Sequence, residues 1–166
     1  ILGINTQNLS NKSAIAVLLV SVTGMGTVIG MTFPLVSLTL ERLDYSATLI
    51  GINSAVGSLG ILAVGLLTAR VVRYFGMLSP IVLAALLAAG SLLAMPALDH
   101  AIGWFGLRFT LAVGLGFLWL ISEAWLNTLA TPENRGHIIG LYGTAFSAGF
   151  ALGPIIIAVI GSQGMI

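Results

Sequence analysis

Five long hydrophobic stretches occupy most of this 166-residue chain. A helix needs about 20 mainly apolar residues to cross the hydrocarbon core of a bilayer, and each stretch meets that length. The links between the stretches are too short to form domains. The sequence therefore predicts an all-α membrane protein, with spans at 14–40, 47–69, 78–98, 102–126 and 138–160.

The composition fits a chain that lies in lipid. Charged residues make up 7% of it and hydrophobic residues 58%, whereas a soluble domain carries about 25% charged residues. The net charge of +1 gives no basic surface for nucleic acid. The chain has no cysteine, and its two histidines have no second ligand at helical spacing. We therefore expect the lipid bilayer as a partner, and neither a metal nor a cofactor.

The basic residues predict the orientation of the spans. Lys12 precedes the first span, Arg70 and Arg73 lie between the second and third, and Arg135 lies between the fourth and fifth. Acidic residues, Asp99 among them, lie in the alternate links. Basic residues gather on the cytoplasmic side of membrane proteins. We therefore predict a cytoplasmic N-terminus in the plasma (cytoplasmic or inner) membrane.

An internal repeat relates the second span to the fifth. The matches share an offset of 89 residues: Leu-Ile-Gly-Ile at 49–52 with Ile-Ile-Gly-Leu at 138–141, Ser58 with Ser147, and Gly60 with Gly149. An odd number of spans in the repeated unit gives its two copies opposite orientations, as in many secondary transporters. The repeat predicts two inverted three-helix units, the second of which needs a sixth span beyond this chain.

Four short motifs follow one another along the chain. The second span ends in Gly-Leu-Leu-Thr-Ala-Arg from Gly65, and the next link reaches Gly76. The fourth span carries Arg108 with two glycines after it, and Pro-Glu-Asn-Arg-Gly precedes the fifth span. The fifth span contains a spaced set, Gly140, Gly149, Gly153 and Pro154.

This order of motifs resembles the major facilitator superfamily. The first motif is similar to the family's loop 2–3 signature, with Ala69 where the family has Asp. The glycine set is similar to the helix-5 motif of drug/proton antiporters, without its final Gly-Gly. The stretch from Ser122 to Asn127 is similar to the YcaD-like branch. The resemblance implies the first five helices of an N-terminal six-helix bundle, whose sixth helix and C-terminal partner half lie outside this chain.

The resemblance also implies a solute carrier that works by alternating access. The antiporter-like glycines favour proton-coupled efflux, and the apolar spans suit a small amphipathic solute. Two alternatives stay open, which are uptake of a small metabolite and a non-transporting helical scaffold or assembly subunit. An enzyme is not expected, because the chain has no phosphate-binding loop, His-Glu-x-x-His or Gly-x-Ser-x-Gly.

Polar side chains inside the spans are the candidate solute contacts. A bare cation in hydrocarbon costs several kcal/mol, so Arg108 is expected to face a cavity or a partner. Its long stem also permits the alternative of snorkelling to the outer surface. The other candidates for the cavity are Thr23, Thr27, Asn53, Trp119 and Tyr142. For the threonines the alternative is a hydrogen bond to a carbonyl of their own helix.

A charge network is predicted near the cytoplasmic ends of the spans. Glu123 is the only acidic residue inside a predicted span, and its depth matches that of Arg70 and Arg73. The family links a comparable carboxylate to the basic residues of loop 2–3. We therefore expect a gate that includes Glu123, these two arginines and Arg135. The alternatives are an interfacial carboxylate in headgroup water and a proton-carrying role for Glu123.

The predicted helix-packing positions are Gly65, Gly76, Gly140, Gly149, Gly153 and Pro154. Gly149 and Gly153 lie one turn apart, and Pro154 removes a backbone hydrogen bond. The fifth span is therefore expected to bend and to press on a helix of the absent half. The alternative is that these glycines pack only against spans of this chain.

The orientation can be tested by cysteine labelling. Cysteines at Ser13, Tyr74 and Asn134 should be shielded from an impermeant thiol reagent in intact cells, whereas cysteines at Tyr45 and Asp99 should react. The charge asymmetry of the links is the reason. Labelling with the two groups exchanged would contradict the predicted orientation.

Overall fold

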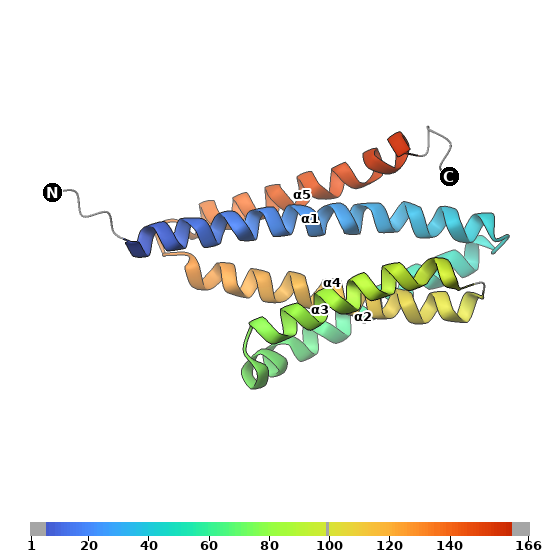
Figure 1. Cartoon of the computed structure of the whole chain (residues 1–166), viewed down its shortest axis with the longest axis horizontal. Helices are drawn as coiled ribbons and strands as arrows, with labels where there is room; N and C mark the ends of the chain where they lie inside the picture. The colour runs from blue at the N-terminus through green and yellow to red at the C-terminus, as the bar shows by residue number, and fades with distance from the viewer. Residues whose placement is uncertain (1–5, 99, 161–166) are drawn as a thin grey trace. The chain divides into compact units, whose positions relative to one another are not determined.

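The computed structural model describes residues 6–98 and 100–160, and this part is helical, without a strand (Figure 1). Asp99, used above to predict the orientation, lies outside the described residues. The elements are α1 (Thr6–Arg42), α2 (Ala47–Phe75), α3 (Leu78–Ala94), the short 3-10 helix η1 (Met95–Ala97), α4 (Ala101–Leu129) and α5 (Arg135–Ile160). The predicted all-α fold class is confirmed.

The helices do not end where the hydrophobic stretches end. In the part of the chain that the structure describes, α1, α2, α4 and α5 are long and apolar enough to cross a membrane, whereas α3 has 17 residues. The third stretch continues as η1 because Pro96 cannot continue the α-helical hydrogen bonds. The four long helices extend beyond their apolar stretches into polar residues. Hydropathy reports where a helix lies in lipid, and helical structure continues outside it.

Backbone conformation shapes the links on either side of α2. Asp44 has φ of 59° between α1 and α2, and Gly76 has φ of 72° after α2. This region of φ is costly for most residues and is open to Gly and, less often, to Asp. The Ser46 side chain accepts a hydrogen bond from the Leu49 N–H and caps the start of α2. These residues explain why both links are short.

The chain divides into two compact units, and each is described by itself. One unit is Phe33–Ile121, which contains the end of α1, all of α2, α3 and η1, and most of α4. The other consists of the described parts of 1–32 and 122–166, which are the first part of α1, the end of α4 and α5.

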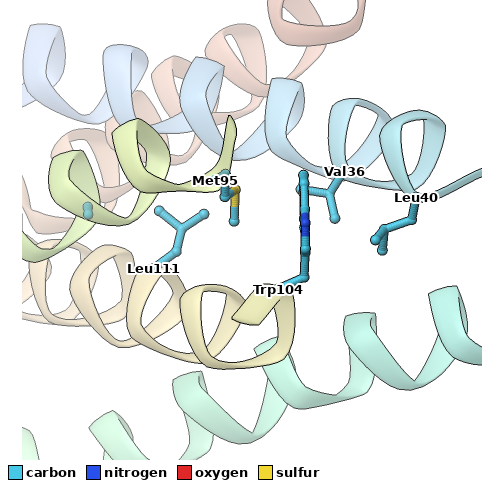
Figure 2. Packing of buried hydrophobic residues seen from close by; sticks show 6 residues of the cluster. Val36, Leu40, Met95, Trp104 and Leu111 are labelled. Atoms are coloured by element: carbon cyan, nitrogen blue, oxygen red, sulfur yellow. The ribbon is translucent and has the colours of Figure 1, made fainter. Parts of the chain in front are cut away.

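An apolar cluster forms the core of the unit Phe33–Ile121. Figure 2 shows the Trp104 ring between Met95 and Val36. The indole N–H of Trp104 donates a hydrogen bond to the Leu98 carbonyl oxygen at 2.9 Å. The buried members of the cluster are Val36, Leu40, Ala88, Met95, Trp104 and Leu111. Residues from α1, α3, η1 and α4 therefore share one core.

In the same unit, α2 and α4 run parallel and meet through small residues. A Cβ atom placed on Gly60 would lie 2.9 Å from the Cβ of Ala112. A Cβ atom placed on Gly116 would lie 3.4 Å from the Cβ of Val64. The residue numbers rise together along both helices, so the pair is parallel. Small residues allow this approach, which favours van der Waals contact in lipid.

The helix α3 packs antiparallel on α4. A Cβ atom on Gly114 would lie 2.7 Å from the Ala84 carbonyl oxygen. Nearer the start of α4, the hydroxyl oxygens of Ser91 and Thr110 lie 2.9 Å apart and share a hydrogen bond. A small-residue contact and one polar contact therefore fix this pair.

In the other unit, α5 lies along the first part of α1 (Figure 1). A Cβ atom on Gly149 would overlap the Thr23 carbonyl oxygen, and one on Gly153 would lie 2.8 Å from the Thr27 carbonyl oxygen. Gly26 likewise faces the backbone of α5 at Phe146. The two helices are parallel and touch backbone to backbone, which only glycine permits.

The two parallel helix pairs share one contact register. Contacts correspond at the offset of 89 residues seen in the sequence: Gly60–Ala112 with Gly149–Thr23, and Val64–Gly116 with Gly153–Thr27. Here α2 corresponds to α5 and α4 corresponds to α1. The repeat therefore extends from the sequence to the packing within each pair.

Candidate solute-binding and gating residues

Arg108 is a buried cation on α4. Its side chain is 6% exposed. Its guanidinium carbon lies 4.9 Å from the centroid of the Phe33 ring, within the range of a cation–π interaction. Its Nε atom is buried and has no hydrogen-bond partner among residues 6–98 and 100–160. This burial does not fit the snorkelling alternative, in which the charge would reach the membrane surface.

The charge of Arg108 is not balanced by a carboxylate within residues 6–98 and 100–160. Breaking a buried ion pair leaves a lone charge at a cost of about 3–5 kcal/mol. A cation–π contact recovers only about 0.5–2 kcal/mol. The site around Arg108 therefore has unused capacity for an anionic group.

Asn53 is a second buried polar residue in this unit, one helical turn before Gly57 on α2. It is 1% exposed, and neither of its amide atoms has a hydrogen-bond partner in the part of the chain that the structure describes. Together with Trp104 it lines a cavity of about 10 Å³, close to the smallest volume that holds one water molecule. A buried amide left without partners costs about 1–3 kcal/mol. Asn53 can therefore offer a donor and an acceptor to a bound molecule.

Tyr142 on α5 occupies the repeat position that corresponds to Asn53. It is 5% exposed, and its buried hydroxyl has no hydrogen-bond partner among the described residues. Within the described residues, each parallel helix pair therefore has a buried polar side chain without a hydrogen-bond partner at this equivalent position. Native structures leave few such groups, and each calls for an explanation.

The predicted threonines of α1 bond to their own helix. The Thr23 hydroxyl donates to the Leu19 carbonyl oxygen at 2.8 Å, and the Thr27 hydroxyl donates to the Thr23 carbonyl oxygen at 2.9 Å. Their donors are therefore used, and only their oxygen lone pairs can face a ligand. Trp119 on α4 is half-buried.

The predicted gate residues are exposed. Arg70 and Arg73 lie near the end of α2, where the Arg73 guanidinium carbon is 5.3 Å from the centroid of the Tyr74 ring. Glu123 lies on the part of α4 that belongs to the other unit. The pairing of Glu123 with Arg70 or Arg73 therefore stays a prediction.

Arg135 has a neutral partner that the sequence analysis did not assign. Its Nη2 donates to Asn127 Oδ1 at 3.0 Å, and Asn127 Nδ2 donates to the Glu123 carbonyl oxygen at 2.9 Å. The amide of Asn127 thus joins the start of α5 to the last turns of α4. The signal was present, since Asn127 ends the stretch that resembles the YcaD-like branch.

The link between α4 and α5 is ordered by its own side chains. Asn134 Oδ1 accepts a hydrogen bond from the Thr131 N–H at 2.8 Å. A hydrogen bond from the Thr131 side chain lowers the pKa of the exposed Glu133 carboxyl below its ordinary value. A lowered pKa means that the folded turn favours the ionised form, so this small stabilisation is lost as the pH falls through that pKa.

The predicted helix-packing glycines differ in their surroundings. The face of α5 with Gly149 and Gly153 is filled by α1, as described above. The Thr23 and Thr27 backbone occupies this face, which favours the alternative that these glycines pack against spans of this chain; contact with a helix of the absent half stays a prediction. Nothing lies within 4 Å of a Cβ atom on Gly140 or on Gly65. Gly76 ends α2, and Pro154 is exposed within α5.

Gly57 and Phe33 contact Arg108 and were not predicted. The Arg108 side chain runs across Gly57, where a Cβ atom would lie 3.0 Å from Nε. Among 21 glycines, no local pattern marks this one, because its partner lies 51 positions further along the chain. Phe33 likewise resembles any other aromatic residue of a membrane span.

Comparison with known protein sequences places the chain in a family. The chain matches the sequence profile of the Major Facilitator Superfamily over residues 16–165. It is 29% identical over 146 residues to the uncharacterized MFS-type transporter YfkF of Bacillus subtilis (strain 168), which covers 88% of this chain and 37% of YfkF. It is 26% identical over 131 residues to the uncharacterized MFS-type transporter YcaD of Escherichia coli (strain K12 / DH10B), which covers 79% of this chain and 34% of YcaD. No solved structure gives a significant match.

The chain belongs to the major facilitator superfamily. It spans about a third of the length of the curated relatives that it matches. The family consists of membrane transporters and not of enzymes. The resemblance inferred from the motifs is confirmed, and so is the assignment to an integral membrane protein.

The backbone contact between α1 and α5 gives a stability prediction. Gly149→Ala and Gly153→Ala should each lower the free energy of unfolding in detergent by about 1–3 kcal/mol, because the added methyl group overlaps the backbone of α1. Gly143→Ala on the same helix is the control, since nothing lies within 4 Å of its Cβ position. Equal thermal midpoints for the three variants would contradict the contact.

Proposed function

We propose that this segment is part of a secondary transporter that moves a small amphipathic solute by alternating access. Arg108 carries the proposal, because it is a buried cation in a membrane span with no carboxylate partner among the described residues. Intramembrane charges of this kind mark solute or ion pathways. Membership of a transporter family supports the same function.

The proposed transporter uses the five spans as the first part of an N-terminal six-helix bundle with inverted three-helix repeats. The shared contact register of the two parallel helix pairs supports the repeat. A sixth span and a C-terminal half complete the protein, as the length of the relatives suggests. The N-terminus is cytoplasmic and the membrane is the plasma membrane, on the basis of the charge asymmetry.

The proposed solute contacts are polar and aromatic side chains within the spans. Arg108 supplies the charge, and Asn53 and Tyr142 supply neutral hydrogen bonds. Trp119 contributes aromatic surface. Thr23 and Thr27 contribute only oxygen lone pairs, because their hydroxyl protons are bonded to α1.

Proton-coupled efflux is the proposed direction of transport. It is supported by the glycine set of α5, which resembles that of drug/proton antiporters. Uptake of a small metabolite remains an alternative with the same binding residues. A non-transporting scaffold is disfavoured, because a scaffold gains nothing from a buried cation and a buried amide without partners.

The charged residues at the helix ends form the proposed gate. Glu123 pairs with Arg70 or Arg73 when the cytoplasmic side is closed. Arg135 is held at the start of α5 by Asn127. Ala69 supports this role for Glu123, because it leaves the loop 2–3 signature without its usual carboxylate.

The transport proposal predicts the effect of removing Arg108. In the whole protein reconstituted into vesicles with an imposed pH gradient, Arg108→Ala should reduce transport of octanoate by about 10–100-fold, as expected for a lost charge-assisted hydrogen bond. Arg108→Lys should recover only part of the activity, because the lysine ammonium keeps the positive charge but cannot form the paired hydrogen bonds of a guanidinium group. Normal octanoate transport by the Ala variant, or no octanoate transport by the wild type, would contradict the proposal.

The gate proposal predicts coupling between opposite charges. Glu123→Arg and Arg70→Glu should each impair transport, and the double variant should restore it. The same cycle with Arg73→Glu identifies which arginine is the partner. If the double-mutant cycles show no coupling energy for Glu123 with Arg70 or with Arg73, Glu123 is only an interfacial carboxylate.

A further inference from the structure

The Arg108 side chain crosses α2 at a position that has no side chain of its own. A Cβ atom on Gly57 would lie 3.0 Å from Nε, 3.6 Å from Cγ and 3.7 Å from Cδ of Arg108. The first distance is tighter than ordinary contacts, so Arg108 would have to move if Gly57 became alanine. Gly57 therefore determines where the guanidinium group lies.

The repeat identifies the residues at the equivalent positions of the other helix pair. At the offset of 89 residues, Gly57 corresponds to Phe146 of α5, and Arg108 corresponds to Leu19 of α1. The corresponding contacts of the two pairs, Gly60 with Ala112 and Gly149 with Thr23, lie three and four residues further along the same helices. One helix pair therefore has a bulky ring and an aliphatic side chain where the other has a glycine and a long cation. The loss of bulk at 57 matches the gain of length and charge at 108.

We propose that Gly57 is a positioning residue that seats Arg108 to bind an oxyanion group of the solute, such as a carboxylate. This inference rests on the proposed transport function and deepens it by naming the substrate class. Asn53, one turn before Gly57 on the same helix, supplies a neutral hydrogen bond beside the charge. Only the α2–α4 pair has this combination of a glycine and an arginine at the equivalent positions.

The chemistry of the surrounding groups favours an anion. The Phe33 ring attracts the cation but offers no lone pair to its N–H groups. The buried Nε keeps an unused donor, and so does the amide of Asn53. A planar oxyanion accepts from a guanidinium group in a paired geometry that a neutral solute does not match. A solute cation would instead add a second positive charge to an unbalanced one.

The test compares two soluble amphiphiles of equal chain length and opposite charge. The thermal midpoint of the purified whole protein is measured against increasing octanoate and increasing octylammonium, which yields an apparent affinity for each. The variants are Gly57→Ala, Arg108→Ala and the double variant Gly57→Phe with Arg108→Leu, which copies Phe146 and Leu19. The control is Gly51→Ala, because Gly51 also lies on α2 and nothing lies within 4 Å of its Cβ position.

The wild type and Gly51→Ala should be stabilised by octanoate and not by octylammonium. Gly57→Ala should bind octanoate at least about tenfold more weakly, because the guanidinium group is displaced. The double variant should unfold at or above the wild-type midpoint without ligand and should show no octanoate response. Such a result separates binding from packing, because the double variant restores apolar packing and lacks the charge.

Other outcomes separate the two proposals. Unchanged octanoate binding by Gly57→Ala, with binding lost in Arg108→Ala, would overturn the role of Gly57 and leave Arg108 in place. Unchanged binding by Arg108→Ala would overturn the role of Arg108 in the proposed function. Stabilisation by octylammonium, or by neither amphiphile, would overturn the assignment of an oxyanion site.

Discussion

Backbone contact through glycine is the interaction on which this structure depends. Between helices in lipid, apolar side chains gain little by leaving the bilayer, so association relies on close van der Waals contact. Gly149 and Gly153 provide it against α1, and Gly60 and Gly116 provide it between α2 and α4. The polar residues are positioned as a consequence, because the helices that carry them are fixed in register by these contacts.

The register also explains why a cation can be kept inside the unit Phe33–Ile121. Arg108 lies one turn before Ala112, which meets Gly60, and one turn after Trp104, which lies in the apolar core. A long side chain between these two fixed points has little freedom, and Gly57 supplies the room that it needs. Its charge is therefore held in place by packing, without an ion pair among the described residues.

Local sequence predicted the helices well and their contacts unevenly. The lengths of the hydrophobic stretches predicted five helices, and residue matches at a constant offset predicted the repeat. Both signals depend on residues that are near each other or at a fixed separation in the sequence. The end of α3 was missed because Pro96 acts on hydrogen bonding and leaves hydropathy unchanged. Gly57 was missed because its role depends on a residue of another helix. The threonines of α1 took the alternative that the sequence had left open, since the nearest acceptor was a carbonyl of the same helix.

The four-residue spacing within the α1–α5 contact has a mechanical consequence. Gly149 and Gly153 are separated by one turn, and so are their partners Thr23 and Thr27. A slide of α5 by four residues, about 6 Å along the axis, would bring Gly149 to Thr27 but would place Ala145 against Thr23, where a Cβ atom overlaps the carbonyl oxygen. Rotation of α5 about its axis would likewise drive side chains into the α1 backbone. The contact therefore blocks both sliding and turning, so this helix pair moves as one rigid body.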